Sequence, residues 1–216
     1  MNDIQARHIP VVILAGGRSS RMQAGGLTGD KYLHLLDDKP VIAHLIERLK
    51  MQADHIALNS NQHQSDLSRF GLPVIADQFA YNSSPLTGIL TAMHYAKDQA
   101  FVVTAAADTP FIPSDLLEKL LSQQQATQSD VVFAASHGAT HPTFGLWRTN
   151  LTEKLSTWLA QSHKPSVISF AMTIKQTIAD FPVQSLPDGS IYDPFFNINE
   201  PADLIKAREL QKQLNR

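Results

Sequence analysis

Short apolar runs alternate with amphipathic stretches through most of the 216-residue chain. Short, continuous, β-branched runs are typical of strands that are buried on both faces of a sheet. Apolar residues at intervals of three and four are typical of helices that pack on such a sheet. Strands are expected at 11–14, 55–60, 73–77, 101–108, 130–135 and 144–147, and helices at 40–51, 86–96 and 113–123. This order predicts an α/β fold with a mostly parallel, doubly wound (Rossmann-like) sheet and helices on both faces.

The last quarter of the chain is expected to be more helical. The apolar spacing favours helices at 151–159, 167–172 and 199–214, a strand at 176–181, and a loop at 184–194 with Asp188–Gly189 at its tip. Asn199 is expected to cap the terminal helix, just as Pro113 and Ser114 are expected to begin the helix at 113–123. The sequence has no internal repeat and no long linker, so residues 1–216 are expected to form a single domain.

Composition narrows the class of protein. Hydrophobic residues make up 43% of the chain and charged residues 18%, as in ordinary globular proteins. The formal net charge of −2 gives no basic field for bulk binding of nucleic acid, and the absence of cysteine excludes disulfides and thiolate chemistry. The N-terminal MNDIQARHIP lacks a signal pattern, and no apolar run approaches the roughly 20 residues of a membrane span. A cytoplasmic protein with neither nucleic-acid nor membrane partners is therefore expected.

The stretch VVILAGGRSSRMQAGGLTGDK runs from a predicted strand into a basic, glycine-rich loop. It does not match the glycine pattern of dinucleotide-binding turns, because RSSR follows its first two glycines. It does not match the P-loop, because an acidic residue precedes its lysine. Paired glycines allow close backbone approach to a ligand, and three cations lie nearby in the sequence. These residues are Gly16, Gly17, Arg18, Arg21 and Lys31. A polyphosphate is the ligand that uses all of them, and a tight turn with solvated arginines is the alternative.

Polar residues follow several of the predicted strands. Ligands of parallel sheets bind beyond the carboxyl ends of the strands, where this chain places Asn59, Asp77 and Asp108. Mg²⁺ prefers one or two carboxylates together with phosphate oxygens and water. Asp108, opposite a basic loop, is therefore a candidate ligand for Mg²⁺, and a turn aspartate before Thr109–Pro110 is the alternative.

The segment LAGGRSSRM…DK resembles the opening signature of the α/β nucleotidyltransferases, which transfer a nucleoside monophosphate from a nucleoside triphosphate. The resemblance implies that residues 14–17 (Leu14, Ala15, Gly16 and Gly17) wrap the triphosphate and that Lys31 contacts it. The chain departs from the family in the spacer QAGGLTG, which is longer than the usual short Gly-Gly spacer.

Later segments resemble the molybdenum cofactor guanylyltransferase (MobA-like nucleotidyltransferase) family. The segments are NSNQHQ, VIADQF, SSPLTGILTAM, HGATHPTFGLW and FFNINEPADL. The resemblance implies that Asn59 and Asp77 contact guanosine and that Gly88 lies near the base and ribose. It implies that Asn197 and Asn199 lie on the side of the pterin phosphate.

Each of these residues also has a purely structural interpretation. A carboxylate accepts hydrogen bonds from the N1–H and amino group of guanine, but Asp77 is equally open as a ribose contact or a loop residue. Asn59 is also typical of a turn, and Gly88 of close helix packing. His141 is more typical of a structural histidine than of a catalytic one.

The resemblance implies a reaction in which GTP and molybdopterin give molybdopterin guanine dinucleotide and pyrophosphate. The terminal phosphate of the pterin is already ionised, so positioning and electrostatics matter more than a general base. The glycine amides, Arg21 and Lys31 would hold the phosphates, and Asp108 would hold Mg²⁺. The resemblance also implies hand-over from molybdopterin-assembling proteins and to apo-molybdoenzymes.

Other functions stay open at the level of sequence. A molybdopterin cytidylyltransferase and a sugar-1-phosphate nucleotidyltransferase share the N-terminal signature. A nucleotide-binding accessory protein without catalysis, or another α/β binding module, would share the fold. The binding module leaves Arg21, Lys31 and Asp108 without a role.

Overall fold

A computed structural model describes residues 5–16, 22, 29–62, 64–77, 84–162 and 165–215. The predictions made for Gly17, Arg18 and Arg21, and for most of the spacer 23–29, lie outside the described residues.

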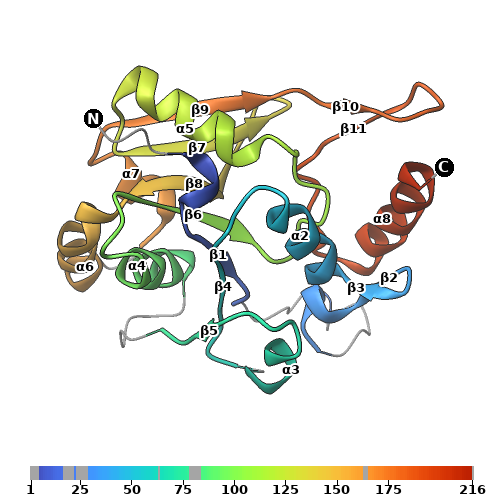
Figure 1. Cartoon of the computed structure of the whole chain (residues 1–216), viewed down its shortest axis with the longest axis horizontal. Coiled ribbons are helices and arrows are strands. Elements are labelled where there is room, and N and C mark those ends of the chain that lie inside the picture. Colours follow the sequence, from blue (N-terminus) through green and yellow to red (C-terminus); the bar gives the residue numbers. More distant parts are fainter. Residues whose placement is uncertain are drawn as a thin grey trace.

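A seven-stranded sheet organises the described part of the chain, in the order β5-β4-β1-β6-β8-β7-β9 (Figure 1). Its strands are β1 (Val11–Leu14), β4 (Ile56–Asn59), β5 (Val74–Ile75), β6 (Phe101–Ala106), β7 (Val131–Ser136), β8 (Ala139–Arg148) and β9 (Gln176–Phe181). Strand β8 is antiparallel to both of its neighbours, and the other pairs are parallel. The predicted mostly parallel α/β sheet is thus confirmed.

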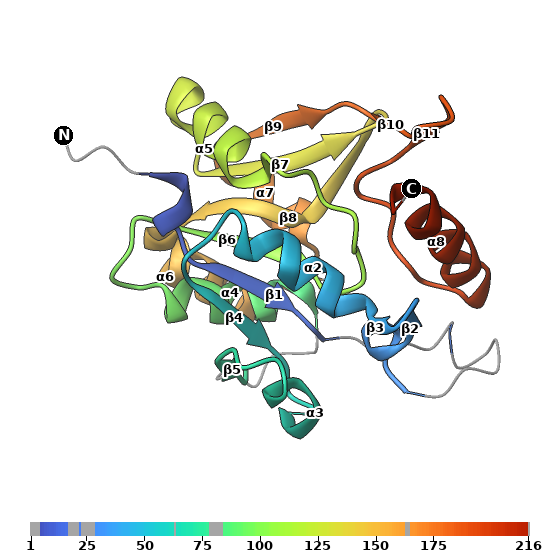
Figure 2. The ribbon, with the colours of Figure 1, turned by 45° about the vertical axis from the view of Figure 1, so that its right-hand side comes forward.

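Helices cover both faces of this sheet, as predicted. They are α2 (Val41–Lys50), α3 (Gln64–Ser68), α4 (Pro85–Tyr95), α5 (Leu116–Thr127), α6 (Thr152–Gln161), α7 (Val167–Ala171) and α8 (Pro201–Leu214), with short 3₁₀ turns at η1 (Ala6–His8), η2 (Lys31–Leu33) and η3 (Thr149–Leu151). Successive side chains of a strand point to opposite faces of the sheet, so β1 contributes to the hydrophobic core on both faces. Val11 and Ile13 of β1 pack with α2 and α5, whereas Val12 packs with α4, α6 and α7. Figure 2 shows α2 and α4 on opposite sides of β1.

Two small hairpins lie outside the sheet, β2 (Leu35–Leu36) with β3 (Lys39–Pro40) and β10 (Gln184–Ser185) with β11 (Ile191–Tyr192). Helix α8 packs beside β2, where the Arg208 guanidinium donates to the Leu35 carbonyl at 3.0 Å. Both views show α8 next to this hairpin (Figures 1 and 2). The C-terminal helix is thereby fixed to the segment that follows Lys31.

Two predicted helix starts are wrong by a few residues. Helix α8 has Glu200, not Asn199, as its N-cap, because the Asp203 carboxylate accepts from the backbone N–H groups of both residues at 3.0 Å. The Asn199 side chain is thereby left for another contact. Helix α5 begins at Leu116 with Asp115 as its N-cap, later than the predicted start at Pro113.

Candidate active site

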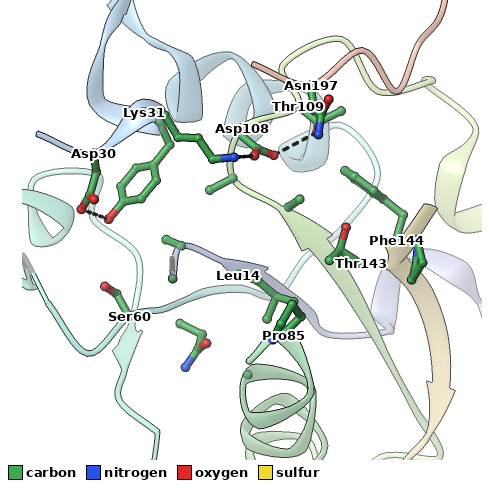
Figure 3. Close-up of a pocket in the computed structure, with 18 of the residues that line it drawn as sticks. Leu14, Asp30, Lys31, Ser60, Pro85, Asp108, Thr109, Thr143, Phe144 and Asn197 are labelled. Atoms are coloured by element: carbon green, nitrogen blue, oxygen red, sulfur yellow. Dashed lines mark hydrogen bonds and ion pairs between the residues drawn. The ribbon is translucent and has the colours of Figure 1, made fainter. Parts of the chain in front are cut away.

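A cavity of about 800 Å³ opens at the carboxyl ends of β1, β4 and β6 (Figure 3). The register brings Leu14 level with Asn59 on one side and Ala106 on the other, so the three strands end at one edge. The cavity is lined by Leu14, Ala15, Gly16, Asp30, Lys31, Tyr32, Asn59, Ser60, Asn61, Gln62, Asp77, Ser84, Pro85, Gly88, Ala106, Ala107, Asp108, Thr109, Thr140, His141, Pro142, Thr143, Phe144, Phe195, Asn197 and Asn199. Its place agrees with the rule that α/β sheets bind ligands beyond the carboxyl ends of their strands.

The cavity exists because β8 separates from β6. Pairing between the two strands stops at Thr104 and Gly145, although β6 continues to Ala106. On the other side of β8, Phe133 pairs with Gly145 while the next residue, Ala134, pairs with His141. Residues 142–144 are therefore an insertion in β8, a bulge that begins at a proline and needs no ladder N–H there. The bulge is the Pro-Thr-Phe part of the His-Pro-Thr-Phe motif, and residues of the whole motif line the cavity.

The Lys31 ammonium forms an ion pair with the Asp108 carboxylate inside this cavity (Figure 3). The same ammonium donates a hydrogen bond to Asn199 Oδ1 at 2.7 Å. The side chains of Lys31 and Asp108 are 22% and 11% exposed, so water screens the pair only partly. Three of the predicted site residues, which are far apart in the sequence, thus meet at one point.

Turn η2 determines the direction of the Lys31 side chain. Tyr32 is buried in the core, and its hydroxyl donates to Asp30 Oδ2 at 2.8 Å. Burial raises the pKa of the Tyr32 hydroxyl, so it stays protonated and remains a donor. With Tyr32 anchored, the preceding lysine faces the cavity. The predicted Asp-Lys pair therefore has a supporting tyrosine that the sequence analysis did not single out.

One wall of the cavity is formed by residues that follow β4 and β5. Asp77 accepts hydrogen bonds from Asn59 at 2.9 Å and from Thr91 at 3.0 Å on Oδ1, and from Asn61 at 2.7 Å on Oδ2. The Asp77 backbone N–H donates to Asn61 Oδ1 at 2.7 Å. The predicted pair of Asn59 and Asp77 is thus brought into direct contact. Asn61 and Thr91 were missed, although Asn61 belongs to the same NSN segment.

Gly88 allows the wall that follows β4 and β5 to form. A Cβ atom at this position would lie 2.7 Å from Asn59 Oδ1 and 3.0 Å from Leu14 Cδ2. The helix α4 therefore approaches Asn59 as closely as a glycine permits. At Gly16 a Cβ atom would meet nothing within 4 Å, so the open space beside the backbone faces the cavity.

Another wall of the cavity combines the β8 bulge with the segment before α8. Ser136 Oγ lies 2.7 Å from His141 Nε2 and donates to Asp193 Oδ1 at 2.7 Å. The His141 ring stacks on Phe195 with centroids 4.6 Å apart. Burial lowers the pKa of His141, and the nearby Asp193 charge opposes this effect. Ser136, Asp193 and Phe195 were missed because nothing in the local sequence links them to His141.

The segment 193–199 is fixed at both of its ends. Asp193 is bound to Ser136, and the backbone N–H of Ile198 donates to the Asp108 carbonyl at 3.0 Å. Ile198 is fully buried, while its two flanking asparagines, Asn197 and Asn199, both line the cavity, as their alternation predicts.

Asp108 fits the expected metal site through its donor chemistry. No group of three or more His, Cys, Asp or Glu side chains suited to a metal occurs within the described residues. Mg²⁺, however, commonly uses one or two carboxylates and takes its other ligands from substrate phosphates and water. Asp108 lies in the cavity with a cation already against it, so the carboxylate is accessible to positive charge.

The fold is shared with solved proteins of low sequence identity. The chain resembles the solved 4-diphosphocytidyl-2C-methyl-D-erythritol synthase of Anaerococcus prevotii, with a TM-score of 0.69 and 12% identity over 96% of this chain and 97% of that one. It also resembles the molybdopterin-guanine dinucleotide biosynthesis protein A of Archaeoglobus fulgidus, with a TM-score of 0.73 and 22% identity over 94% of this chain and 99% of that one.

Sequence comparison identifies the family of this chain more specifically than the fold does. Residues 11–176 match the MobA-like NTP transferase domain, and the chain belongs to this family. A molybdenum cofactor guanylyltransferase of Brucella ovis is 43% identical over 212 residues, which cover 98% of this chain and 96% of that protein. None of the helices in the described ranges is both long and apolar enough to span a membrane.

Proposed function

We propose that this protein transfers GMP from GTP to the terminal phosphate of molybdopterin, giving molybdopterin guanine dinucleotide and pyrophosphate. The similarity to a guanylyltransferase across almost the whole chain supports this reaction. The structural observation that carries the proposal is the contact of Lys31 with both Asp108 and Asn199 between two distinct walls of one cavity. Such a junction suits a transfer from one bound molecule to another.

The wall of Asn59, Asn61, Asp77 and Gly88 is the proposed nucleoside side, and Leu14 and Ala15 are proposed to line it. An ionised carboxylate offers about four acceptor positions. Asp77 already uses two of them on Oδ1 and one on Oδ2. One further hydrogen bond from guanosine can therefore reach Oδ2 without rearrangement, whereas two hydrogen bonds from the base would require Asn61 to move.

The proposed chemistry is an in-line displacement. A terminal phosphate oxygen of the pterin forms a bond to the α-phosphorus of GTP, and the bond to the bridging oxygen breaks, so that pyrophosphate leaves with the electron pair. The barrier arises from repulsion between anions, which fixed positive groups and N–H donors lower. Lys31 is proposed to leave Asp108 and contact the phosphates, together with Gly16, Gly17 and Arg21.

Asp108 is the proposed ligand of Mg²⁺. Once bound there, Mg²⁺ would screen the negative charge on the α-phosphate and on the leaving pyrophosphate. Asn199 then keeps Lys31 within the site after the lysine has released Asp108, since its amide oxygen lies 2.7 Å from the ammonium. Asn197 and Asn199 are the proposed contacts of the pterin phosphate.

Three wider expectations are part of the same proposal. Residues 1–216 are proposed to act as one domain, because β9 belongs to the central sheet and α8 packs on the hairpin after Lys31. A cytoplasmic location is also proposed, because the absence of cysteine fits a protein of that compartment. Molybdopterin-assembling proteins and apo-molybdoenzymes are the proposed partners for delivery and release.

A thermal-shift panel with GTP, CTP, UTP and ATP, each with and without Mg²⁺, tests the nucleotide. Ligands that bind the folded state raise the melting temperature by mass action. A Mg²⁺-dependent shift with GTP alone is expected, followed by release of pyrophosphate when molybdopterin is added. Selectivity for CTP, or no pyrophosphate release with GTP and molybdopterin, would overturn the proposal.

A further inference from the structure

The two ring nitrogens of His141 differ in their contacts within the described part of the chain. Its Nε2 lies 2.7 Å from Ser136 Oγ, and Ser136 is fully buried. Within residues 5–16, 22, 29–62, 64–77, 84–162 and 165–215, Nδ1 has no hydrogen-bond partner and is not enclosed. Because His141 belongs to the cavity lining, Nδ1 is the polar atom that this side chain offers to a ligand.

A count of protons assigns the tautomer of this ring. Asp193 Oδ1 accepts from Ser136 Oγ at 2.7 Å and from the Phe195 backbone N–H at 2.8 Å. An ionised carboxylate only accepts, and a serine hydroxyl has a single hydrogen to donate. Ser136 gives that hydrogen to Asp193, so the hydrogen between Ser136 and His141 must come from Nε2. A neutral His141 then has a lone pair, and no hydrogen, on Nδ1.

The ring is also held in one orientation. It stacks on Phe195 at an interplanar angle of 18°. Phe195 in turn is held edge-on by Phe144 at 5.1 Å and by Phe181 at 5.4 Å between ring centroids. Burial favours the neutral ring, and Asp193 is the charged group that opposes this preference. His141 therefore presents an oriented hydrogen-bond acceptor to the cavity.

We infer that His141 is a specificity-determining residue that accepts a hydrogen bond from an N–H group of the acceptor's nitrogen heterocycle, and that Ser136 and Asp193 are its positioning residues. The inference rests on the proposed function for the identity of the acceptor. The unprotonated oxygens of an ionised phosphate only accept hydrogen bonds, so a lone pair on Nδ1 repels them. The phosphate of the acceptor thus lies toward Lys31 and Asn197, and its heterocycle lies toward His141.

A matched pair of substitutions separates recognition from structural support. In His141→Asn the side-chain oxygen falls near the place of Nδ1, whereas in His141→Gln the amide reaches the place of Nε2 and Ser136. If Nδ1 recognises the acceptor, KM for molybdopterin rises about tenfold in the Gln variant, the size expected for one lost hydrogen bond. The Asn variant stays within about threefold of the parent, and KM for GTP changes in neither variant. The opposite order would assign His141 a structural role alone and overturn the inference.

Nitrogen-15 NMR of the imidazole tests the inference independently of the transfer reaction. In the free protein at pH 7.5, Nδ1 of His141 is expected to resonate as an unprotonated nitrogen and Nε2 as a protonated one. Ser136→Ala is expected to restore a mixture of both tautomers. A protonated Nδ1 in the parent protein would refute the inference even if GMP transfer proceeds. Absence of transfer with the predicted tautomer present would instead refute the proposed function.

Discussion

The ammonium of Lys31 and the carboxylate of Asp108 are paired inside the cavity. The two groups proposed to bind the phosphates and the metal therefore neutralise each other in the free protein. In the proposed reaction, Asp108 would exchange this contact for the metal and Lys31 would exchange it for phosphate. Because Asn199 also holds Lys31, the lysine can exchange partners without leaving the cavity.

Substitution of Lys31 by alanine removes the described cation closest to Asp108. The single-turnover rate of GMP transfer is expected to fall well over tenfold, as is usual when a charge partner of the transition state is lost. Lys39→Ala is the matched control, since Lys39 is exposed and pairs with the exposed Glu47. A rate in Lys31→Ala close to that of the control would contradict the role of Lys31.

Asp108→Asn keeps the shape of the side chain and removes its charge. Turnover is expected to fall well over tenfold, and the part of the GTP-induced thermal shift that depends on Mg²⁺ should disappear. The free protein should also melt at a lower temperature, because the partly buried ammonium of Lys31 then loses its ion pair with Asp108. The exposed Asp98→Asn is the control. An unchanged response to Mg²⁺ would exclude Asp108 as the metal ligand.

Gly88→Ala tests the packing of α4 against the nucleoside side of the cavity. Alanine in a helix interior is normally more stable than glycine by about 1 kcal/mol. Here the new Cβ would lie 2.7 Å from Asn59 Oδ1, and Asn59 donates to Asp77. We expect the dissociation constant for GTP to rise and the melting temperature to stay level or fall. Titration calorimetry with GTP and a melting curve check both, and a stabilised variant with normal GTP affinity would show that the contact is not needed.

The central strands could be predicted because burial on both faces leaves a continuous apolar run. Val11–Leu14 and Phe101–Ala106 are such runs, and both are strands over nearly their predicted range. Strand β8 is longer than predicted because its first residues, around His141 and Pro142, are polar or lack an N–H and look like loop. Its antiparallel direction comes from a tight turn in which His137 and Gly138 have φ of 48° and 76°.

The members of the site were predictable one at a time, but their contacts were not. Lys31 and Asn199 were each singled out from separate motifs, yet 168 positions separate them in the sequence. Asn199 was also expected to cap a helix, and Asp203 removes that need by binding the backbone at the helix start. Ser136 and Asp193 have no motif at all, since their function depends on a contact across 57 positions.

The lowered pKa of His141 has a consequence for stability. Burial, the dominant cause, lowers the pKa of the folded imidazole below the value of about 6.5 in an unfolded chain. Between those two values the unfolded chain binds more protons, so the free energy of unfolding falls as the pH drops. The contribution of His141 is thus complete above about pH 6.5 and is lost as the pH falls toward the folded pKa.

Urea unfolding of the parent and of His141→Gln at pH 7.5 and pH 5.5 measures this contribution. The chain has nine histidines, and His34 has a pKa that burial also lowers, so the comparison must be a difference between the two proteins. Acidification should reduce the free energy of unfolding more in the parent than in the variant, because only the parent must bury the imidazole at position 141, which protonates when the chain unfolds. Equal losses in the two proteins would mean that His141 titrates normally, with its ring open to water rather than held between Ser136 and Phe195.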